Sequence, residues 1–499
     1  MAKILASLYT IILSPPALPA AAEQHVGESV TKVRIVIYVD FPINNPEVQT
    51  SHPNDQRLYL YDLPTEIIIQ IFALVLVNSH EFVVILAQLS RHLREIVLST
   101  PGLWSVVSLT NKKYTLERAR LWRSRNNGLL KALYIRASPG FHILSAFEVF
   151  SDVPLDALRY LMIDEWTYDA LHKYMPNLTP SVIANLHTLH IRHSDQSWLT
   201  ATFSSLSLRH LIAEASIIDW ARLGEYATQL RRLVYVEGID SRSVPDILWA
   251  LHRNTNLESV YMQSDGHMSG NGLPQPSVVP KVLPSRIQLP HLESLTVHGG
   301  ALGDGQLWEH LSLPNLRTVD LARLWANINP MIINLQNSGA VPNLMSLSIS
   351  YTFGSGSFPS QALVIQVLRE AKQLRYLQLF QLPCIQDIIH AMTHEPTEHC
   401  PNLTTLDLSM CREVSAELLA PLVEARNERA FNIEGQVSDS SDDAHRAGHA
   451  QVSPIRKLVL NGCKLLAVDQ VILPWLKQRV SRVTCHYDRT RRERQPRRR

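Results

Sequence analysis

The sequence contains little cysteine, little charge and no long apolar run. Its five cysteines all lie beyond residue 383. A sparse, odd-numbered set does not form a disulfide framework, and it is typical of a reducing compartment. Charged residues make up only 18% of the chain, against ~25% in a typical soluble protein, which argues against a largely disordered protein. No apolar run approaches the ~20 residues of a membrane-spanning helix, and this disfavours an integral membrane protein.

The motifs of common catalytic sites are also missing. The sequence has no glycine-rich phosphate-binding loop and no Gly-x-Ser-x-Gly elbow. His390 and His394 would share one face of a helix. The zinc motif His-Glu-x-x-His is not complete there, because Pro396 follows Glu395 and His399 stands one residue too late. We therefore expect no catalytic residue, no metal and no cofactor.

A short pattern, Leu-x-x-Leu-x-Leu, recurs along most of the chain. It begins at thirteen positions, the last of them weaker: Leu130, Leu158, Leu186, Leu208, Leu230, Leu257, Leu292, Leu316, Leu344, Leu374, Leu403, Ile455 and Val480. Nine of the twelve spacings are 22–29 residues, which is the length of a leucine-rich repeat. The longest spacing, 52 residues, includes a polar insert at 432–453 that we expect to be a disordered loop.

Each repeat is expected to add one short strand and one returning segment. Alternate strand residues point to opposite faces, so the leucines face a core between neighbouring repeats. Because one repeat cannot bury its own apolar face, we expect residues 110–488 to stack into a horseshoe-shaped solenoid of parallel strands with outer helices. Gln361–Lys372 and Ala416–Arg426 are two candidate outer helices. Cys411 and Cys463 stand after their strands, where this repeat buries a cysteine or an asparagine.

Residues 58–109 lack the repeat and predict a small all-α module. Pro64 suits the first turn of a helix, and Glu66 complements the helix dipole there. Two further helices are expected over about Glu81–Leu89 and Arg91–Leu98, before the turn at Pro101. Three short helices form a very small core, which tends to need a partner or a following domain. The predicted fold class is therefore α/β, with an all-α module followed by a leucine-rich-repeat solenoid.

This module resembles an F-box. The opening of that family is present as Leu63, Pro64, Glu66, Ile67, Ile71 and Phe72, and its Leu-Ser-Thr-Pro-x-Leu-Trp ending as Leu98–Trp104. The ending is similar to that of the F-box proteins abundant in mushroom-type fungi, and F-box modules followed by leucine-rich repeats are a known pairing. Two positions depart from the family: Leu89-Ser90 stands where many relatives have Val-Cys, and Leu93 where many have Trp.

The resemblance implies a substrate receptor and not an enzyme. An F-box docks on the Skp-type adaptor of a cullin–RING ubiquitin ligase, and the repeats then hold a protein substrate near the charged conjugating enzyme. The adaptor contacts that the resemblance implies are Leu63, Pro64, Ile67, Ile71, Leu86, Leu89 and Leu93. A scaffold that binds the adaptor without directing ubiquitin transfer is an alternative that the sequence leaves open.

Substrate contacts are expected on the strand face opposite the leucines. The fifth and seventh residues of each motif point to that face. They include Tyr134, Arg136, Asp164, His190, Arg192, Glu214, Tyr261, Gln263, His298, Asp320, Gln378, Phe380 and Asp407. This set mixes aromatic residues with both signs of charge, as a protein-binding surface does. It lacks the single-sign stripe that nucleic acid requires, so a protein is the expected partner.

The two ends of the chain leave a second hypothesis open. Residues 1–22, within the extension 1–57, resemble a secretory signal, with Lys3 before an apolar stretch. A secreted leucine-rich-repeat recognition protein would be cleaved near Ala22 and carry a glycan on Asn177. The tail 489–499 holds seven Arg and one Glu, and with a net charge of +2 for the chain the remaining residues sum to −4. Such a tail is typical of a nuclear-localisation signal or of an electrostatic arm for nucleic acid or acidic partners. We expect the protein in the cytoplasm, the nucleus or both, with secretion as the alternative.

Overall fold

The chain divides into two compact units, Met1–Trp104 and Ser105–Arg499. In the computed structural model, the described residues are 63–78, 82–136, 140–193, 207–216, 218–236, 244–264, 284–299, 306–324, 328–351, 359–383, 385–434, 452–463 and 471–486. The extension 1–57, most of the predicted insert 432–453 and the tail 489–499 lie outside them. In the described part, no helix has both the length and the apolar character required to cross a bilayer.

The first unit contains three helices followed by a 3-10 helix. They are α2 (Thr65–Asn78), α3 (Phe82–Leu89), α4 (Arg91–Ser99) and η2 (Pro101–Trp104), close to the predicted ranges. Ser90 caps α4, because its Oγ accepts a hydrogen bond from the Leu93 amide at 3.2 Å. The Trp104 indole donates to the Val97 carbonyl at 2.9 Å, which closes the unit. The buried apolar residues are Ile68, Phe72, Val83, Leu86, Leu93, Ile96, Val97, Leu103 and Trp104.

The second unit is a solenoid built on one parallel sheet of fourteen strands. In sheet order these are β1 (Val106–Thr110), β2 (Ala132–Arg136), β3 (Tyr160–Asp164), β4 (Thr188–Arg192), β5 (His210–Glu214), β6 (Arg232–Val236), β7 (Ser259–Ser264), β9 (Ser294–Gly299), β11 (Thr318–Leu324), β12 (Ser346–Tyr351), β13 (Tyr376–Phe380), β14 (Thr405–Asp407), β15 (Lys457–Val459) and β16 (Arg482–Thr484). Each of the thirteen predicted motifs forms a strand that begins two residues after the first apolar residue of the motif. The leucine-rich-repeat prediction is confirmed.

Strand β1 was not predicted. It lies partly within 58–109, the range that the sequence assigned to the all-α module, so the sheet starts earlier than expected. Val107 and Leu109 are its buried residues and alternate with half-buried ones, which makes it a regular strand without the leucine motif.

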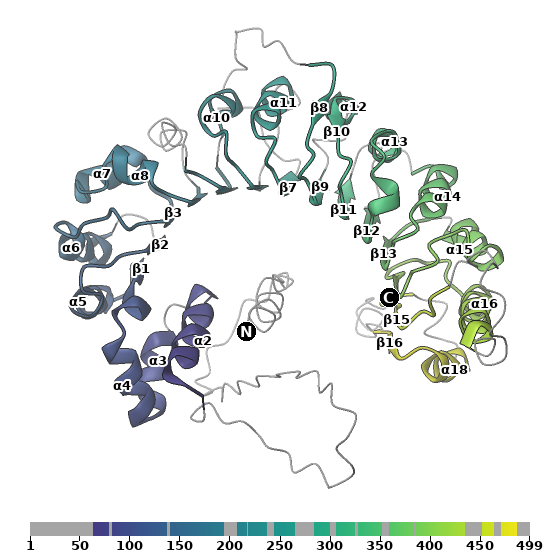
Figure 1. The fold of residues 1–499 in the computed structure, drawn as a ribbon, viewed down its shortest axis with the longest axis horizontal. Coiled ribbons are helices and arrows are strands. Elements are labelled where there is room, and N and C mark those ends of the chain that lie inside the picture. The colour runs from purple at the N-terminus through teal and green to yellow at the C-terminus, as the bar shows by residue number, and fades with distance from the viewer. Residues whose placement is uncertain are drawn as a thin grey trace, which may run out of the picture. The chain divides into compact units, whose positions relative to one another are not determined.

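The returning segments lie on the outer side of the curved solenoid and the strands on its inner side (Figure 1). The helices are α5 (Thr115–Arg125), α6 (Phe141–Phe150), α7 (Tyr168–Tyr174), α8 (Pro180–Ala184), α10 (Trp220–Tyr226), α11 (Val244–Arg253), α12 (Gln306–Glu309), α13 (Asn329–Asn337), η4 (Val341–Asn343), α14 (Gln361–Glu370), α15 (Ile385–His394), α16 (Ala416–Glu434) and α18 (Ile472–Arg479). Two short strands, β8 (Ile287–Gln288) and β10 (Leu311–Ser312), pair in parallel as a separate sheet. Both helices predicted from the sequence are present, as α14 and α16. Helix α16 continues to Glu434, into the predicted insert.

Leucines and cysteines of the motif fill the core between repeats. Leu133 and Ile135 of β2, for example, are fully buried. Cys411 and Cys463 are buried as predicted, and their thiols donate to the carbonyls of Leu379 (2.9 Å) and Leu408 (3.2 Å) in the preceding repeat. Burial raises the pKa of the Cys411 thiol to about 11 and that of Cys463 to about 12, so both stay protonated and unreactive at neutral pH.

Asparagines before the first leucine connect one repeat to the next. Asn315, Asn343 and Asn402 each follow a proline and precede a motif leucine. Their amide nitrogens donate to carbonyls of the preceding repeat, those of Pro290 (2.7 Å), Pro314 (3.0 Å) and Lys372 (2.8 Å). Each acceptor stands two residues before the first leucine of its own motif, so these hydrogen bonds repeat with the solenoid. They satisfy backbone groups where the chain turns into the strand.

The eighth residue of the motif, at the end of the strand or up to three residues beyond it, adopts a left-handed backbone in seven repeats. These residues are Glu165, His193, Ala215, Gly299, Gln381, Met410 and Gly462, with φ between 46° and 92°. The amide of Ala215 donates to the Val236 carbonyl of the next repeat at 2.8 Å, and that of His193 donates to Glu214 at 3.0 Å. The turn thus continues the hydrogen bonding of the sheet, at a conformational cost wherever the residue is not glycine.

A buried arginine joins the chain across the predicted insert. Arg426 of α16 is fully buried, and its guanidinium donates to the carbonyls of Cys400 (2.8 Å), Pro401 (3.0 Å) and Ser453 (3.2 Å). Burial lowers the pKa of this guanidinium to about 10, so it remains charged at neutral pH. Arg426 therefore connects α16 to the turn before β14 and to the segment that leads into β15.

We predict that Ala215→Gly stabilises the solenoid. Glycine adopts the left-handed conformation at Ala215 without steric cost, and the expected gain in the free energy of unfolding is about 0.5–1 kcal/mol. Urea denaturation followed by circular dichroism measures it. Ala391→Gly in the middle of α15 is the control and should destabilise the protein by a similar amount. A loss of stability in Ala215→Gly would contradict the strain assigned to the eighth position.

Candidate functional site

The candidate binding surface is the inner strand face, which we define as the side chains at the third, fifth and seventh motif positions. Strands β4, β5 and β13 show the alternation that this assignment requires, with the apolar fourth and sixth residues buried and the others half-buried or exposed. All thirteen residues that the sequence predicted for substrate contact lie on strands at these positions. Because the strands pair in register, equal motif positions stand side by side, and the face consists of three parallel rows.

The N-terminal end of the inner strand face is an apolar cluster. Tyr134 is only 7% exposed and packs with Ala132 and Met162. Its ring lies 4.8 Å from that of Tyr160, and burial raises the pKa of both phenols. The guanidinium of Arg136 lies 5.1 Å from the Tyr134 ring. Tyr134 is therefore part of the packed structure of the face and not the exposed contact that the sequence predicted.

A row of alternating charge follows at the seventh position. Arg136, Asp164, Arg192 and Glu214 occupy it on four consecutive strands. Arg192 lies 3.3 Å from Glu214, and His190 of the fifth position contacts the same carboxylate at 3.3 Å. The hydrogen bond from His190 holds the pKa of the Glu214 carboxyl below its ordinary value. Burial opposes this decrease, and Arg192 adds to it. These charges largely neutralise one another.

Polar networks occupy the middle and the C-terminal part of the face. The Tyr261 hydroxyl donates to Gln263 at 2.6 Å, and His298 lies between that hydroxyl (3.3 Å) and Asp320 (3.1 Å), so three strands are linked.

Further along, Gln378 donates to Asp407 at 3.3 Å and accepts from Ser348 at 2.9 Å. Burial, followed by Asp407 and Asp320, raises the pKa of Tyr376 to about 12. Phe380 is half-buried at the seventh position of the same strand as Gln378. This part of the face offers amide, hydroxyl and carboxylate groups that are already positioned by their neighbours, as a protein-binding surface requires.

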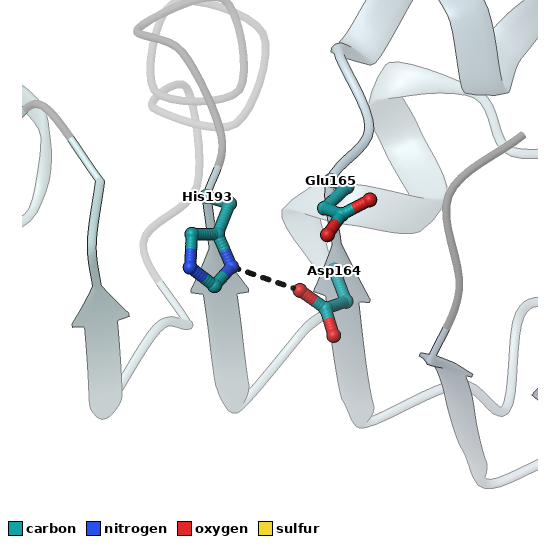
Figure 2. A group of neighbouring side chains, drawn as sticks. All are labelled: Asp164, Glu165 and His193. Atoms are coloured by element: carbon teal, nitrogen blue, oxygen red, sulfur yellow. Dashed lines mark hydrogen bonds and ion pairs between the residues drawn. The ribbon is translucent and has the colours of Figure 1, made fainter.

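Three ligand-type side chains meet at the end of β3 and β4 (Figure 2). The donor atoms of Asp164, Glu165 and His193 lie within 4.8 Å of one another. The His193 ring contacts Asp164 at 3.2 Å, and the two side chains are 50% and 20% exposed. Among the described residues this is the one group whose spacing approaches a metal-ligand set. The hydrogen bond between His193 and Asp164 accounts for the approach of these two side chains.

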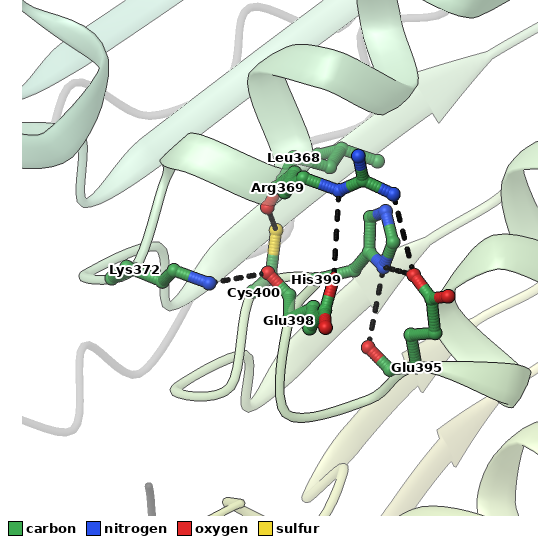
Figure 3. A network of polar contacts seen from close by, with 7 residues as sticks. All are labelled: Leu368, Arg369, Lys372, Glu395, Glu398, His399 and Cys400. Atoms are coloured by element: carbon green, nitrogen blue, oxygen red, sulfur yellow. Dashed lines mark hydrogen bonds and ion pairs between the residues drawn. The ribbon is translucent and has the colours of Figure 1, made fainter.

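Of the three histidines that approach a zinc motif, His399 has a structural role (Figure 3), whereas His390 and His394 are exposed on α15. His399 is 1% exposed, and its Nδ1 lies 3.2 Å from the backbone carbonyl of Glu395. The Cys400 thiol donates to the Leu368 carbonyl at 3.2 Å, and Arg369 pairs with Glu395 at 3.3 Å. These contacts connect α14 to the turn after α15.

The first unit presents only part of the predicted adaptor surface. Pro64 is exposed, Leu63, Ile67 and Ile71 are half-buried, and Leu89 is 56% exposed. Leu86 and Leu93 are 0% and 1% exposed, so they form the core of the unit and offer no surface to a partner. Ile85, which the sequence did not predict, is 45% exposed one helical turn before Leu89.

A basic row at the second motif position was also missed. It consists of Lys131, Arg159, His187, Arg209 and Arg231, from five consecutive repeats, and is called the strand-start row below. All but the half-buried His187 are exposed. The signal is present in the sequence, where the second residues of these five motifs are Lys, Arg, His, Arg and Arg, but the alternation of a strand points to the fifth and seventh positions and not to the second.

We predict that Glu214→Gln lowers stability more at neutral pH than in acid. Because the pKa of Glu214 is lower in the folded state, its contribution is present above the ordinary value of 4.5 and is lost as pH falls through the folded value. The expected loss at pH 7 is under about 1 kcal/mol, because the pair is partly exposed. Urea midpoints at pH 7 and pH 3 measure it, with the exposed Glu148→Gln as control. An equal loss at both pH values would assign the effect to packing instead.

Comparison with known proteins identifies similarity to solved structures alone. No protein-family model matches it. No curated protein matches it either. Among solved structures, a chain from the crystal structure of the Rad7 and Elc1 complex in yeast is similar at 16% identity, over 83% of this chain and 87% of that chain, with a TM-score of 0.39. A likeness at this level carries no argument about function, which rests on the residues described above.

Proposed function

We propose that the chain is the substrate-recognition subunit of a cullin–RING ubiquitin ligase. The first unit binds the Skp-type adaptor in the manner of an F-box, and the solenoid binds a protein substrate on its inner strand face. The chain itself performs no covalent step. It contributes proximity, because a held substrate presents its lysines to the conjugating enzyme at a high effective concentration.

The observation that carries the proposal is the exposed apolar stripe of the three-helix unit. Ile85 and Leu89 stand four residues apart on α3, so they share one face of the helix, and they are 45% and 56% exposed. Pro64 is exposed at the start of α2. Exposed aliphatic side chains on such a small unit favour a protein partner.

The burial pattern revises which residues of the F-box resemblance would touch the adaptor. Among the described side chains of this unit, Pro64, Ile85, Leu89 and Leu98 are exposed apolar groups, and Ile67 and Ile71 can add partial contact. Leu86 and Leu93 act indirectly by holding the helices together. Substituting either of them tests folding and not adaptor binding.

The solenoid supports the substrate-binding half of the proposal. Its fourteen in-register strands present half-buried polar groups that are held in place by contacts across neighbouring strands. Preorganised side chains lose little entropy when a partner binds.

The secreted alternative is less favoured by the hydrogen bonds of the sequon asparagines. A glycan would be attached to the amide nitrogen of Asn177, which donates to the carbonyls of Phe150 (2.8 Å) and Val153 (2.7 Å). The amide nitrogen of Asn402 is engaged with Lys372 in the same way. Both asparagines therefore have a structural reason to be present.

We predict that Leu89→Arg weakens binding to the Skp-type adaptor. A charge within the apolar stripe must be desolvated on docking, and the expected loss of affinity is about 100-fold, or roughly 3 kcal/mol. Isothermal titration calorimetry of the purified full chain with the adaptor measures it. Val471→Arg, at an 80% exposed aliphatic side chain of the solenoid, is the matched control and should bind as the unmodified chain does.

Unchanged affinity in a folded Leu89→Arg variant would contradict the assigned surface, and absence of binding by the unmodified chain would contradict the F-box assignment. An adaptor-binding scaffold is distinguished in a second step. Ubiquitin transfer to a bound substrate in the reconstituted ligase is expected for a receptor and not for a scaffold.

A further inference from the structure

The strand-start row is a second charged surface, separate from the inner strand face. Successive members are joined by backbone hydrogen bonds: the Arg159 amide donates to Lys131 (2.9 Å), His187 to Arg159 (2.9 Å), Arg209 to His187 (2.9 Å) and Arg231 to Arg209 (2.7 Å). Parallel strands lie about 4.8 Å apart, so the row extends over about 19 Å. Equivalent positions of successive repeats direct these side chains to one edge of the sheet.

The charges of the row are mostly unneutralised, in contrast to those of the inner strand face. Among the described residues, Arg231 alone of the four cations has a carboxylate within 4 Å, that of Glu258 at 3.0 Å. Within the described part of the chain, the Arg159 guanidinium donates to two backbone carbonyls, those of Asp156 and Leu158, and to no side chain. The carboxylate of Asp156 is exposed nearby without an ion pair among the described residues.

A neighbouring histidine reports the same positive field. His210 stands at the third position, beside Arg209. Burial lowers its pKa most, and Arg232 lowers it further. Glu258 opposes this decrease, whereas Arg209 and Arg231 add to it. Arg232 is exposed and extends the positive charge onto β6.

The row has defined ends. Before Lys131, the equivalent position is Ser105, which is buried. After Arg231, the second position holds Glu258 and then Glu293, which line a polar hollow together with Arg317. The positive surface is therefore confined to five repeats, and an extended polypeptide of about six residues would cover it.

We propose that the strand-start row binds a short acidic segment of a partner polypeptide, whose carboxylates pair with Lys131, Arg159, Arg209 and Arg231. An extended acidic chain matches the length of the row and the sign of its charge. The inference does not depend on adaptor binding by the first unit.

Nucleic acid fits the row less well. Bases bound without sequence preference stack on exposed aromatic rings, and the described residues of the row offer none. The nearest aromatic side chain at the third position, Tyr160, is already packed against Tyr134. The glutamates at one end would repel a phosphate backbone that continued along the edge.

Fluorescence anisotropy of the full chain with a labelled peptide of alternating Asp and Glu, roughly six residues long, tests the proposal. The test variant is Arg159→Glu/Arg209→Glu, two exposed members that flank His187. The matched control is Arg375→Glu/Arg456→Glu, two exposed second-position arginines that flank Thr404 outside the row. We expect the test variant to weaken binding about tenfold or more and the control to change it less than about twofold, with binding weakened by salt in all cases. Circular dichroism checks that each variant is folded.

Four results would overturn the proposal. The first is that the unmodified chain does not bind the peptide, and the second is that the test and control variants lose equal affinity for it. The third is that affinity falls only when the seven arginines of 489–499 are changed to glutamine. The fourth is that a single-stranded oligonucleotide of equal charge binds more tightly than the peptide and depends on the row. The last would identify the row as a nucleic-acid site. A loss confined to Arg159→Glu/Arg209→Glu, with the oligonucleotide bound more weakly than the peptide, supports it.

Discussion

The register of the parallel sheet is the constraint on which the rest of the solenoid depends. Backbone hydrogen bonds pair each motif position with the same position in the next repeat, for example Leu133 with Leu161 and then Leu189. A residue type that recurs at one motif position therefore becomes a continuous row in space. Leucines at the first, fourth and sixth positions become the core, and no single repeat could bury them alone. The same rule produces the asparagine contacts, the left-handed eighth residues and the strand-start row.

Most of the fold could be predicted because repeated residues carry it. Thirteen strands follow from the leucine spacing alone, and the outer helices α14 and α16 follow from apolar periodicity. Strand β1 could not be found this way, because its alternation of Val107 and Leu109 is too short to stand out. The left-handed turns were hidden because five of the seven residues there are not glycine, so their conformation comes from the next repeat and not from local preference.

The candidate sites were predicted less well, for two physical reasons. A resemblance to a family indicates which residue types stand at which positions, but it does not show which of them are buried in this chain. Leu86 and Leu93 were therefore expected at a surface, although helix packing places them in the core. The alternation of residues along a strand shows on which face a side chain lies, but not whether neighbouring side chains bury it there. Tyr134 is on the predicted face, yet the adjacent Tyr160 and Met162 bury it. The strand-start row precedes the strands, where a search guided by strand alternation does not look.

The two surfaces of the solenoid differ in how their charges are used. On the inner strand face, Arg192 and Glu214 neutralise each other and His190 contacts the same carboxylate, so binding there would depend on shape and on placed hydrogen bonds. On the strand-start row the charges are open to solvent, which favours fast, salt-sensitive association over fine discrimination. A partner that touched both would be attracted by one surface and selected by the other.

The tolerance of the solenoid to changes in length follows from the placement of its variable segments. Motif spacings range from 22 to 52 residues, yet Thr405 still pairs with Lys457 across the longest one. Arg426, before the predicted insert, bonds Ser453, after it, so both ends of that segment are fixed to the same repeat. Sequence between these anchors is free to lengthen, shorten or diverge without moving either binding surface. During evolution such a chain can change in length between two repeats while its recognition surfaces keep their spacing.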